Sequence, residues 1–168
     1  INKAKNLLEK TTKIQPNFAL ANFNLGNLLA ETKQYKKAKK SFSEAIKIRP
    51  DLYGAHNNLG LTLRSLGDYK SAINCYKEAI RIRPNHGGAH SNLGRAYSEL
   101  GEFEKAINAL SAAIKLEPKN LYNYYYLSEL KKDFLDTKLL DEVKQILSSQ
   151  NQTKRNLAYG NFLLASHE

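Results

Sequence analysis

The sequence predicts an all-α fold, a right-handed superhelical solenoid of antiparallel helix pairs. The first reason is the spacing of proline, which occurs only at residues 16, 50, 84 and 118, so that every interval is 34 residues long. The second is that each interval holds two apolar-periodic stretches, for example 52–65 and 69–82, separated by a short break at Gly67-Asp68. A fixed period of this size is typical of proteins whose repeated units stack in a row.

Small and bulky residues recur at fixed positions of each unit. The small residues leave room for the two helices of a pair to approach, and the bulky residues fill the space between neighbouring helices. Proline then ends the second helix, because it has no N–H and disfavours helical geometry in the residue before it. The recurring residues are Leu25-Gly26, Leu59-Gly60 and Leu93-Gly94; Ala38, Ala72 and Ala106; Phe42, Tyr76 and Leu110; and Ala45, Ala79 and Ala113.

This pattern resembles the tetratricopeptide repeat (TPR) over residues 19–118. We predict a single TPR domain with a half repeat at 1–18, regular repeats at 19–52, 53–86 and 87–120, a degenerate repeat at 121–152, and the first helix of a further repeat at 153–168. Because the chain contains no Met and is cut inside a repeat at both ends, we expect it to be an excerpt of a longer protein. The resemblance implies that the first helix of each pair lines a concave surface.

The predicted ligand-binding residues lie on these first helices. Asn24, Asn58 and Asn92 share one repeat position, and a carboxamide can both donate to and accept from a peptide backbone. This row is similar to the asparagine ladder of O-linked N-acetylglucosamine transferase, although asparagine is also simply frequent at this position of such repeats. The full predicted peptide-binding set is Asn24, Asn27, Asn58, Asn92, Arg64, Arg95, Tyr122, Tyr125 and Tyr126.

The tyrosines of this set are candidate anchors, because a rigid ring with a polar tip binds well at a groove end. Tyr124 instead occupies the repeat position of His56 and His90, so we expect it to pack within the fold.

TPR proteins that hold the acidic tails of heat-shock chaperones use a carboxylate clamp of two asparagines and three cations. The corresponding residues here match both asparagines but lack all three cations, so chaperone-tail binding is not expected. They are Phe23, Asn27, Asn58, Gly88 and Asn92.

The charge of the chain is +10, but it is concentrated at one end, since residues 1–50 contain 11 basic and 3 acidic side chains. The run from Lys33 to Lys40 holds five lysines and is predicted to form a solvated convex face. The alternative is a docking surface for an acidic protein, an anionic membrane or a nucleic acid. Nucleic-acid binding is not favoured, because such proteins usually carry a basic stripe along their whole length.

Other function classes have little support in the sequence. No apolar run approaches the length of a membrane span, and no secretory signal is recognised at the start of the chain. The single cysteine, Cys75, cannot form an internal disulfide, and no metal-ligand spacing, phosphate-binding loop or nucleophile motif is found. We therefore predict a cytoplasmic protein that is not an enzyme and needs no cofactor or metal.

The predicted function is a scaffold that binds an extended peptide or a helix of a partner protein in the concave groove. The alternative is the substrate-presenting arm of a sulfotransferase or glycosyltransferase whose catalytic domain lies outside this chain. Residues 119–152 resemble the region that joins TPR arrays to sulfotransferase domains in some bacterial proteins. A third possibility is self-association through apolar faces exposed on the end helices.

Overall fold

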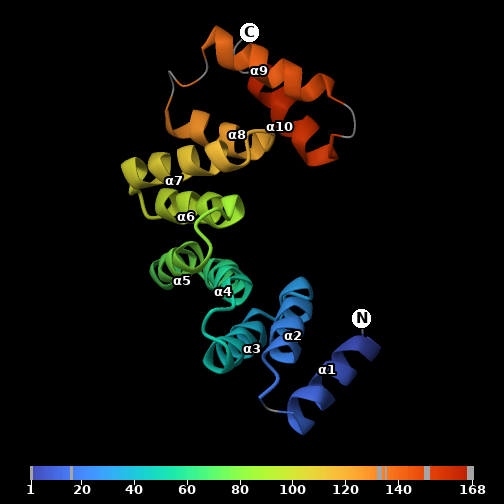
Figure 1. The fold of residues 1–168 in the computed structure, drawn as a ribbon. Coiled ribbons are helices and arrows are strands. Elements are labelled where there is room, and N and C mark those ends of the chain that lie inside the picture. Colours follow the sequence, from blue (N-terminus) through green and yellow to red (C-terminus); the bar gives the residue numbers. More distant parts are fainter. Residues whose placement is uncertain (1, 16, 132–133, 135, 150–151, 166–168) are drawn as a thin grey trace.

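The computed structural model describes residues 2–15, 17–131, 134, 136–149 and 152–165, which contain ten helices and no strand (Figure 1). The helices stack one upon the next along the chain, with α1 and α10 near opposite ends of the stack (Figure 1). The predicted all-α solenoid is therefore confirmed. The helices are α1 (Asn2–Ile14), α2 (Ala19–Glu31), α3 (Tyr35–Ile48), α4 (Tyr53–Ser65), α5 (Tyr69–Ile82), α6 (Gly87–Glu99), α7 (Phe103–Leu116), α8 (Leu121–Leu130), α9 (Thr137–Ser148) and α10 (Lys154–Ala165).

A glycine on the first helix sets the close approach of each regular pair. A Cβ atom built on Gly60 would lie 2.5 Å from the ring of Tyr76, which is fully buried on α5. The same relation joins α2 to α3 and α6 to α7, where Cβ atoms at the equivalent glycines would lie 2.6 and 2.7 Å from Phe42 and Leu110. The recurring alanines of the second helices are fully buried at these contacts. The bulky residue of each second helix thus fills the space that glycine leaves open.

One polar side chain near the start of a first helix ties successive units together. It contacts the carbonyl oxygen of the proline in the turn that follows the preceding second helix, a backbone acceptor that needs a hydrogen-bond partner where it is shielded from water. The three contacts are His56 Nε2 to Pro50 O at 2.8 Å, His90 Nε2 to Pro84 O at 2.9 Å, and Tyr124 Oη, which donates to Pro118 O at 3.0 Å. The recurrence of these side chains is therefore structural, as expected for Tyr124.

The turns within the pairs need a left-handed residue. Gly67 and Gly101 have φ angles of 80° and 75°, while Lys33 holds the equivalent position with a φ of 57°. The next N–H folds back onto the first helix in each case, for example Gln34 N to Leu29 O at 2.8 Å. Lys33 thus adopts a backbone conformation that disfavours any residue with a Cβ.

The last three helices pack differently from the regular pairs. Ser128 and Leu140 stand where the other units have glycine and alanine, and α8 is only ten residues long. Since these larger residues prevent a close approach, α9 contacts α10 more extensively than it contacts α8, and α10 packs directly against α8. Leu121, Tyr124, Val143 and Leu163 form a separate small core there.

Replacing Lys33 by glycine is predicted to stabilise the fold. The left-handed conformation costs a residue with a Cβ about 1–2 kcal/mol, and substitution by glycine removes this cost. Part of the gain in stability is lost again, because glycine has greater conformational freedom in the unfolded chain. We expect the free energy of unfolding to rise by about 0.5–1 kcal/mol for Lys33→Gly in urea denaturation. The control Lys33→Ala removes the same charge but keeps the strain. An equal gain from both variants would contradict the backbone explanation.

Replacing Gly60 by alanine is predicted to open the α4–α5 contact. The added methyl group would collide with the buried Tyr76 ring, so we expect a loss of about 1–3 kcal/mol. Gly54 lies on the same helix, but a Cβ there meets the nearest atom, on Phe23, at an ordinary 3.5 Å. Thermal unfolding followed by circular dichroism should therefore show a lower midpoint for Gly60→Ala and little change for Gly54→Ala. Similar losses at both sites would argue against the contact.

Candidate functional site

The first helices form the inner side of the stack. Apart from its own partner, α4 also packs against α2 and α6, so the first helices of neighbouring pairs touch one another. Helices that are closest together across successive pairs lie on the concave side of a curved array. These contacts agree with the expectation, implied by the resemblance to TPR proteins, that the first helix of each pair lines the concave surface.

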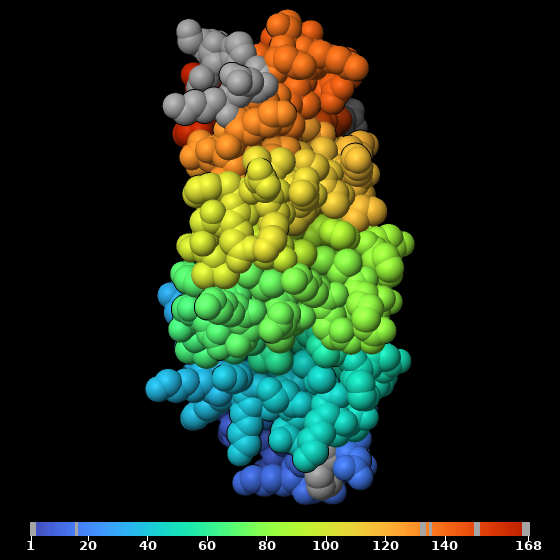
Figure 2. All heavy atoms as spheres, turned by 90° about the vertical axis from the view of Figure 1, so that its left-hand side faces the viewer, coloured from blue at the N-terminus to red at the C-terminus, as the bar shows by residue number. Residues whose placement is uncertain are grey.

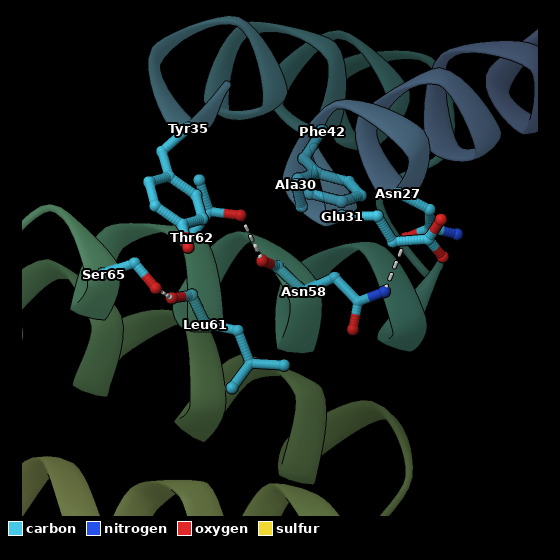
Figure 3. Close-up of a pocket in the computed structure, with 9 residues that line it drawn as sticks. All are labelled: Asn27, Ala30, Glu31, Tyr35, Phe42, Asn58, Leu61, Thr62 and Ser65. Carbon is cyan, nitrogen blue, oxygen red and sulfur yellow. Dashed lines mark hydrogen bonds between the residues drawn. The ribbon is translucent and has the colours of Figure 1, made fainter. Parts of the chain in front are cut away.

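Four asparagines on this surface form a continuous chain of hydrogen bonds across three helices. Asn92 on α6 donates to Asn57 Oδ1 at 3.0 Å, and Asn57 donates to Asn58 Oδ1 at 3.0 Å. Asn58 on α4 then donates to Asn27 Oδ1 on α2 at 2.8 Å (Figure 3). We call this set, Asn27, Asn57, Asn58 and Asn92, the amide chain. It links three successive repeats through their side chains.

The amide chain differs from the row expected from equivalent repeat positions. Asn58 and Asn92 belong to both, but Asn24 is exposed and has no side-chain hydrogen bond to any described residue. Asn57, which is 8% exposed, joins the chain although it does not belong to the predicted set. The sequence does place Asn57 among the groove-facing positions of its first helix, but its hydrogen-bond partners depend on how neighbouring repeats are rotated relative to one another.

A cavity of about 320 Å³ lies beside the amide chain, between α2, α3 and α4 (Figure 3). Asn27 and Asn58 border it, and Phe42 contributes the apolar ring that also fills the glycine contact. The cavity therefore combines an apolar ring with the side-chain amides of Asn27 and Asn58. Its lining residues are Asn27, Ala30, Glu31, Tyr35, Phe42, Asn58, Leu61, Thr62 and Ser65.

The predicted tyrosines gather in one aromatic cluster at the junction of α8 and α10. Tyr122, Tyr125 and Tyr126 are half-buried and contact two aromatic residues of α10 that sequence reasoning did not include, Tyr159 and Phe162. Phe162 is 51% exposed, so the cluster reaches the surface. The ring centroids are separated by 4.6 Å for Tyr122–Tyr126, 5.1 Å for Tyr122–Tyr159, Tyr125–Tyr126 and Tyr125–Tyr159, and 5.0 Å for Tyr125–Phe162.

One of the two predicted arginines, Arg95, lies over these aromatic rings, whereas Arg64 on α4 interacts with Tyr76. The Arg95 guanidinium carbon lies 4.9 Å from the centroid of Tyr126 and 5.4 Å from that of Tyr122. Burial raises the pKa of Tyr76 to about 12, while the positive charge of Arg64 partly opposes this rise. The Tyr76 hydroxyl and Arg64 Nε are both buried, and neither forms a hydrogen bond of normal geometry with a described residue. Arg64 therefore interacts with the core residue Tyr76, and it forms no ion pair with a described carboxylate.

The five lysines of the Lys33–Lys40 run are all exposed, on α3 and the turn before it. Figure 2 shows light-blue side chains of this stretch projecting from the surface of the stack. Their positions agree with the predicted solvated face.

The described residues contain no recognisable group of catalytic or metal-binding side chains. Burial raises the pKa of the Cys75 thiol to about 11, so it stays protonated and poorly nucleophilic at neutral pH. Within those residues, no three His, Cys, Asp or Glu side chains are grouped to hold a metal ion. No described helix combines the length and apolar character needed to span a membrane.

Breaking the amide chain at Asn57 is predicted to destabilise the fold. Asn57→Ala removes two hydrogen bonds and leaves the amides of Asn58 and Asn92 short of partners, which costs about 1–3 kcal/mol. The exposed Asn24 provides the control, since Asn24→Ala should change stability by less than about 0.5 kcal/mol. Urea denaturation of both variants tests this, and equal effects would contradict a structural amide chain.

Several solved structures share this fold. A double mutant of MamA RS-1 has a TM-score of 0.75 and 22% sequence identity, covering 99% of this chain and 86% of that one. MamA 41-end from Desulfovibrio magneticus RS-1 has a TM-score of 0.74 and 22% sequence identity, covering 99% of this chain and 87% of that one. The first TPR of Spaghetti (RPAP3) bound to the HSP90 peptide SRMEEVD has a TM-score of 0.67 and 20% sequence identity, covering 68% of this chain and 90% of that one. At these identities the likeness concerns the fold alone.

Comparison of the sequence itself gives a more direct result. No curated protein matches the chain significantly. A family model described as tetratricopeptide repeat matches residues 19–52 and 88–120, and one described as TPR repeat matches residues 60–101. The matched segments together make up more than half of the chain and include the pairs α2–α3 and α6–α7 in full, together with α5 and α4 from Gly60 onward. The chain belongs to the tetratricopeptide repeat family.

Proposed function

We propose that this protein is an interaction scaffold that binds an extended peptide or a helix of a partner protein in its concave groove. The observation that carries the proposal is the amide chain, which presents carboxamides from three successive repeats on one surface. A row of this kind suits a ligand whose backbone runs along the stack.

The amides retain bonding capacity beyond the chain itself. Each carboxamide has two N–H donors and an oxygen with two lone pairs. Asn58 and Asn92 each donate one bond within the chain, and Asn27 only accepts there, so N–H groups remain for a ligand carbonyl. The Asn92 oxygen accepts no bond from a described residue and is available to a ligand N–H. Since these amide groups would form hydrogen bonds with the ligand's backbone, the groove can bind ligands of many different sequences.

Two flanking features supply preferences for ligand side chains. The cavity at Asn27 and Asn58 accepts a small apolar group at one end of the amide chain. The aromatic cluster at α8 and α10 lies at the other end and offers rings for an aromatic or cationic side chain. A ligand with apolar residues on both sides of its backbone contact therefore fits the groove.

The RPAP3 neighbour was solved with an HSP90 peptide, but a different ligand is proposed for this chain. The positions that correspond to clamp cations hold Phe23, Gly88 and Asn92, none of which can form an ion pair with a carboxylate. The acidic tail SRMEEVD is accordingly a suitable negative control in binding experiments.

Peptide binding is predicted to depend on the amide chain. In a peptide-array screen at physiological salt, Asn58→Ala/Asn92→Ala should bind about tenfold or more weakly than the parent, because two ligand hydrogen bonds are lost. Circular dichroism verifies that the variant keeps its helicity.

The matched control replaces two exposed asparagines of the outer helices, Asn74→Ala/Asn108→Ala, and should bind like the parent. Unchanged binding by the groove variant would overturn the proposal. So would binding that appears only at low salt and disappears when the Lys33–Lys40 run is neutralised.

A further inference from the structure

Arg64 and Arg95 place two positive charges on neighbouring first helices of the groove. Arg64 lies on α4 and Arg95 on α6, the first helices of neighbouring pairs. Both guanidinium groups lower the pKa of the same two phenols, Tyr76 and Tyr122, against a larger rise caused by burial. The Arg95 guanidinium carbon lies 5.4 Å from the centroid of the Tyr122 ring, and Arg64 lies on α4, which packs against α6.

Neither arginine is neutralised by the protein. Every ion pair between described residues joins side chains three or four positions apart within one stretch of helix, and none includes Arg64 or Arg95. Arg64 Nε is buried and lacks an acceptor among the described residues. The Arg64 side chain as a whole is half-buried, so an incoming anionic oxygen can reach its guanidinium group without competition from a described protein carboxylate.

The aromatic rings hold Arg95 in a defined place. Its guanidinium lies over both Tyr122 and Tyr126, and stacking of this kind restricts the motion of a long side chain. A ligand therefore meets a preorganised donor and loses less entropy on binding. Asn92 lies three positions before Arg95, on the same face of α6, so the charge is next to an amide of the proposed backbone grip.

We propose that Arg64 and Arg95, with the hydroxyl groups of Tyr122 and Tyr126, form a subsite for an anionic side chain of the bound peptide. The inference rests on the proposed peptide-binding function and specifies its ligand class: an acidic or phosphorylated residue next to the segment held by the amide chain. Carboxylate and phosphate share the planar or forked oxygen geometry that guanidinium binds with two parallel hydrogen bonds. The subsite differs in position from a chaperone-tail clamp, whose cationic positions are Phe23, Gly88 and Asn92 here.

The test measures selectivity with four libraries of short fluorescein-labelled peptides that have randomised flanks and a fixed central residue. The central residue is Glu, phosphoserine, Gln or Lys, and affinity is measured by fluorescence anisotropy at physiological salt. The Glu and phosphoserine libraries are expected to bind at least about tenfold more tightly than the Gln library, with Lys the weakest. Comparison of Glu with phosphoserine shows which anion the site prefers.

Arg64→Gln/Arg95→Gln should abolish this selectivity, so that the ratio of the Glu-library affinity to the Gln-library affinity falls to about one. The matched control, Lys36→Gln/Lys40→Gln, removes the same charge from the exposed outer surface and should keep the selectivity. An unchanged Glu-to-Gln ratio in the arginine variant, or an equal loss in the lysine control, overturns the subsite. If the double variant loses helicity, Arg95→Gln alone decides: a reduced ratio supports the subsite, and an unchanged ratio overturns it.

The same libraries separate this inference from the proposed function. If peptides bind and Asn58→Ala/Asn92→Ala weakens them without any preference for anions, the groove function stands and the subsite fails. If no library binds, or if binding ignores the asparagines, the proposed groove function fails and the subsite fails with it.

Discussion

The contact between a glycine on one helix and a bulky side chain on the next is the constraint on which the rest of the solenoid depends. Gly60 and Tyr76 show its strictness, because a single added methyl group would lie 2.5 Å from the ring. Protein interiors are close-packed, so such a contact fixes both the separation and the rotation of the two helices. When three pairs repeat it, the first helices meet one another on the inner side, and side chains from different repeats come within hydrogen-bonding distance.

The loss of this contact explains the different C-terminal part. Ser128 and Leu140 occupy the places of the glycine and alanine, and the two helices of that unit no longer approach as a regular pair. Because α10 then packs on α8, Tyr159 and Phe162 meet Tyr125 and complete the aromatic cluster. A departure from the repeat pattern thus generates a chemically distinct end of the groove.

The sequence predicts the fold well because the fold depends on periodic, local features. The stretches 52–65 and 69–82 correspond closely to α4 (Tyr53–Ser65) and α5 (Tyr69–Ile82). The candidate site is predicted less completely, since the partners of Asn57 and the rings stacked on Tyr125 depend on the rotation between units. Several expectations stay predictions, because they concern repeat alignment, further sequence or behaviour in solution. They are the repeat boundaries, the origin of the chain as an excerpt of a longer protein, its alternative role as the arm of a transferase, self-association and cytoplasmic location.

The polar side chains of the groove are of two kinds. Some form hydrogen bonds with one another within the protein, and others have no described protein partner of opposite charge. The asparagines bind one another, so much of their bonding capacity stabilises the arrangement of three repeats and only the remainder can reach a ligand. Arg64 and Arg95 have no protein carboxylate among the described residues and keep their charge available. In the proposed groove, a grip on the ligand backbone contributes affinity for many sequences, whereas half-buried arginines without a described protein carboxylate favour ligands that carry a negative charge. Selectivity in such a scaffold therefore arises from the groups that folding leaves without a partner.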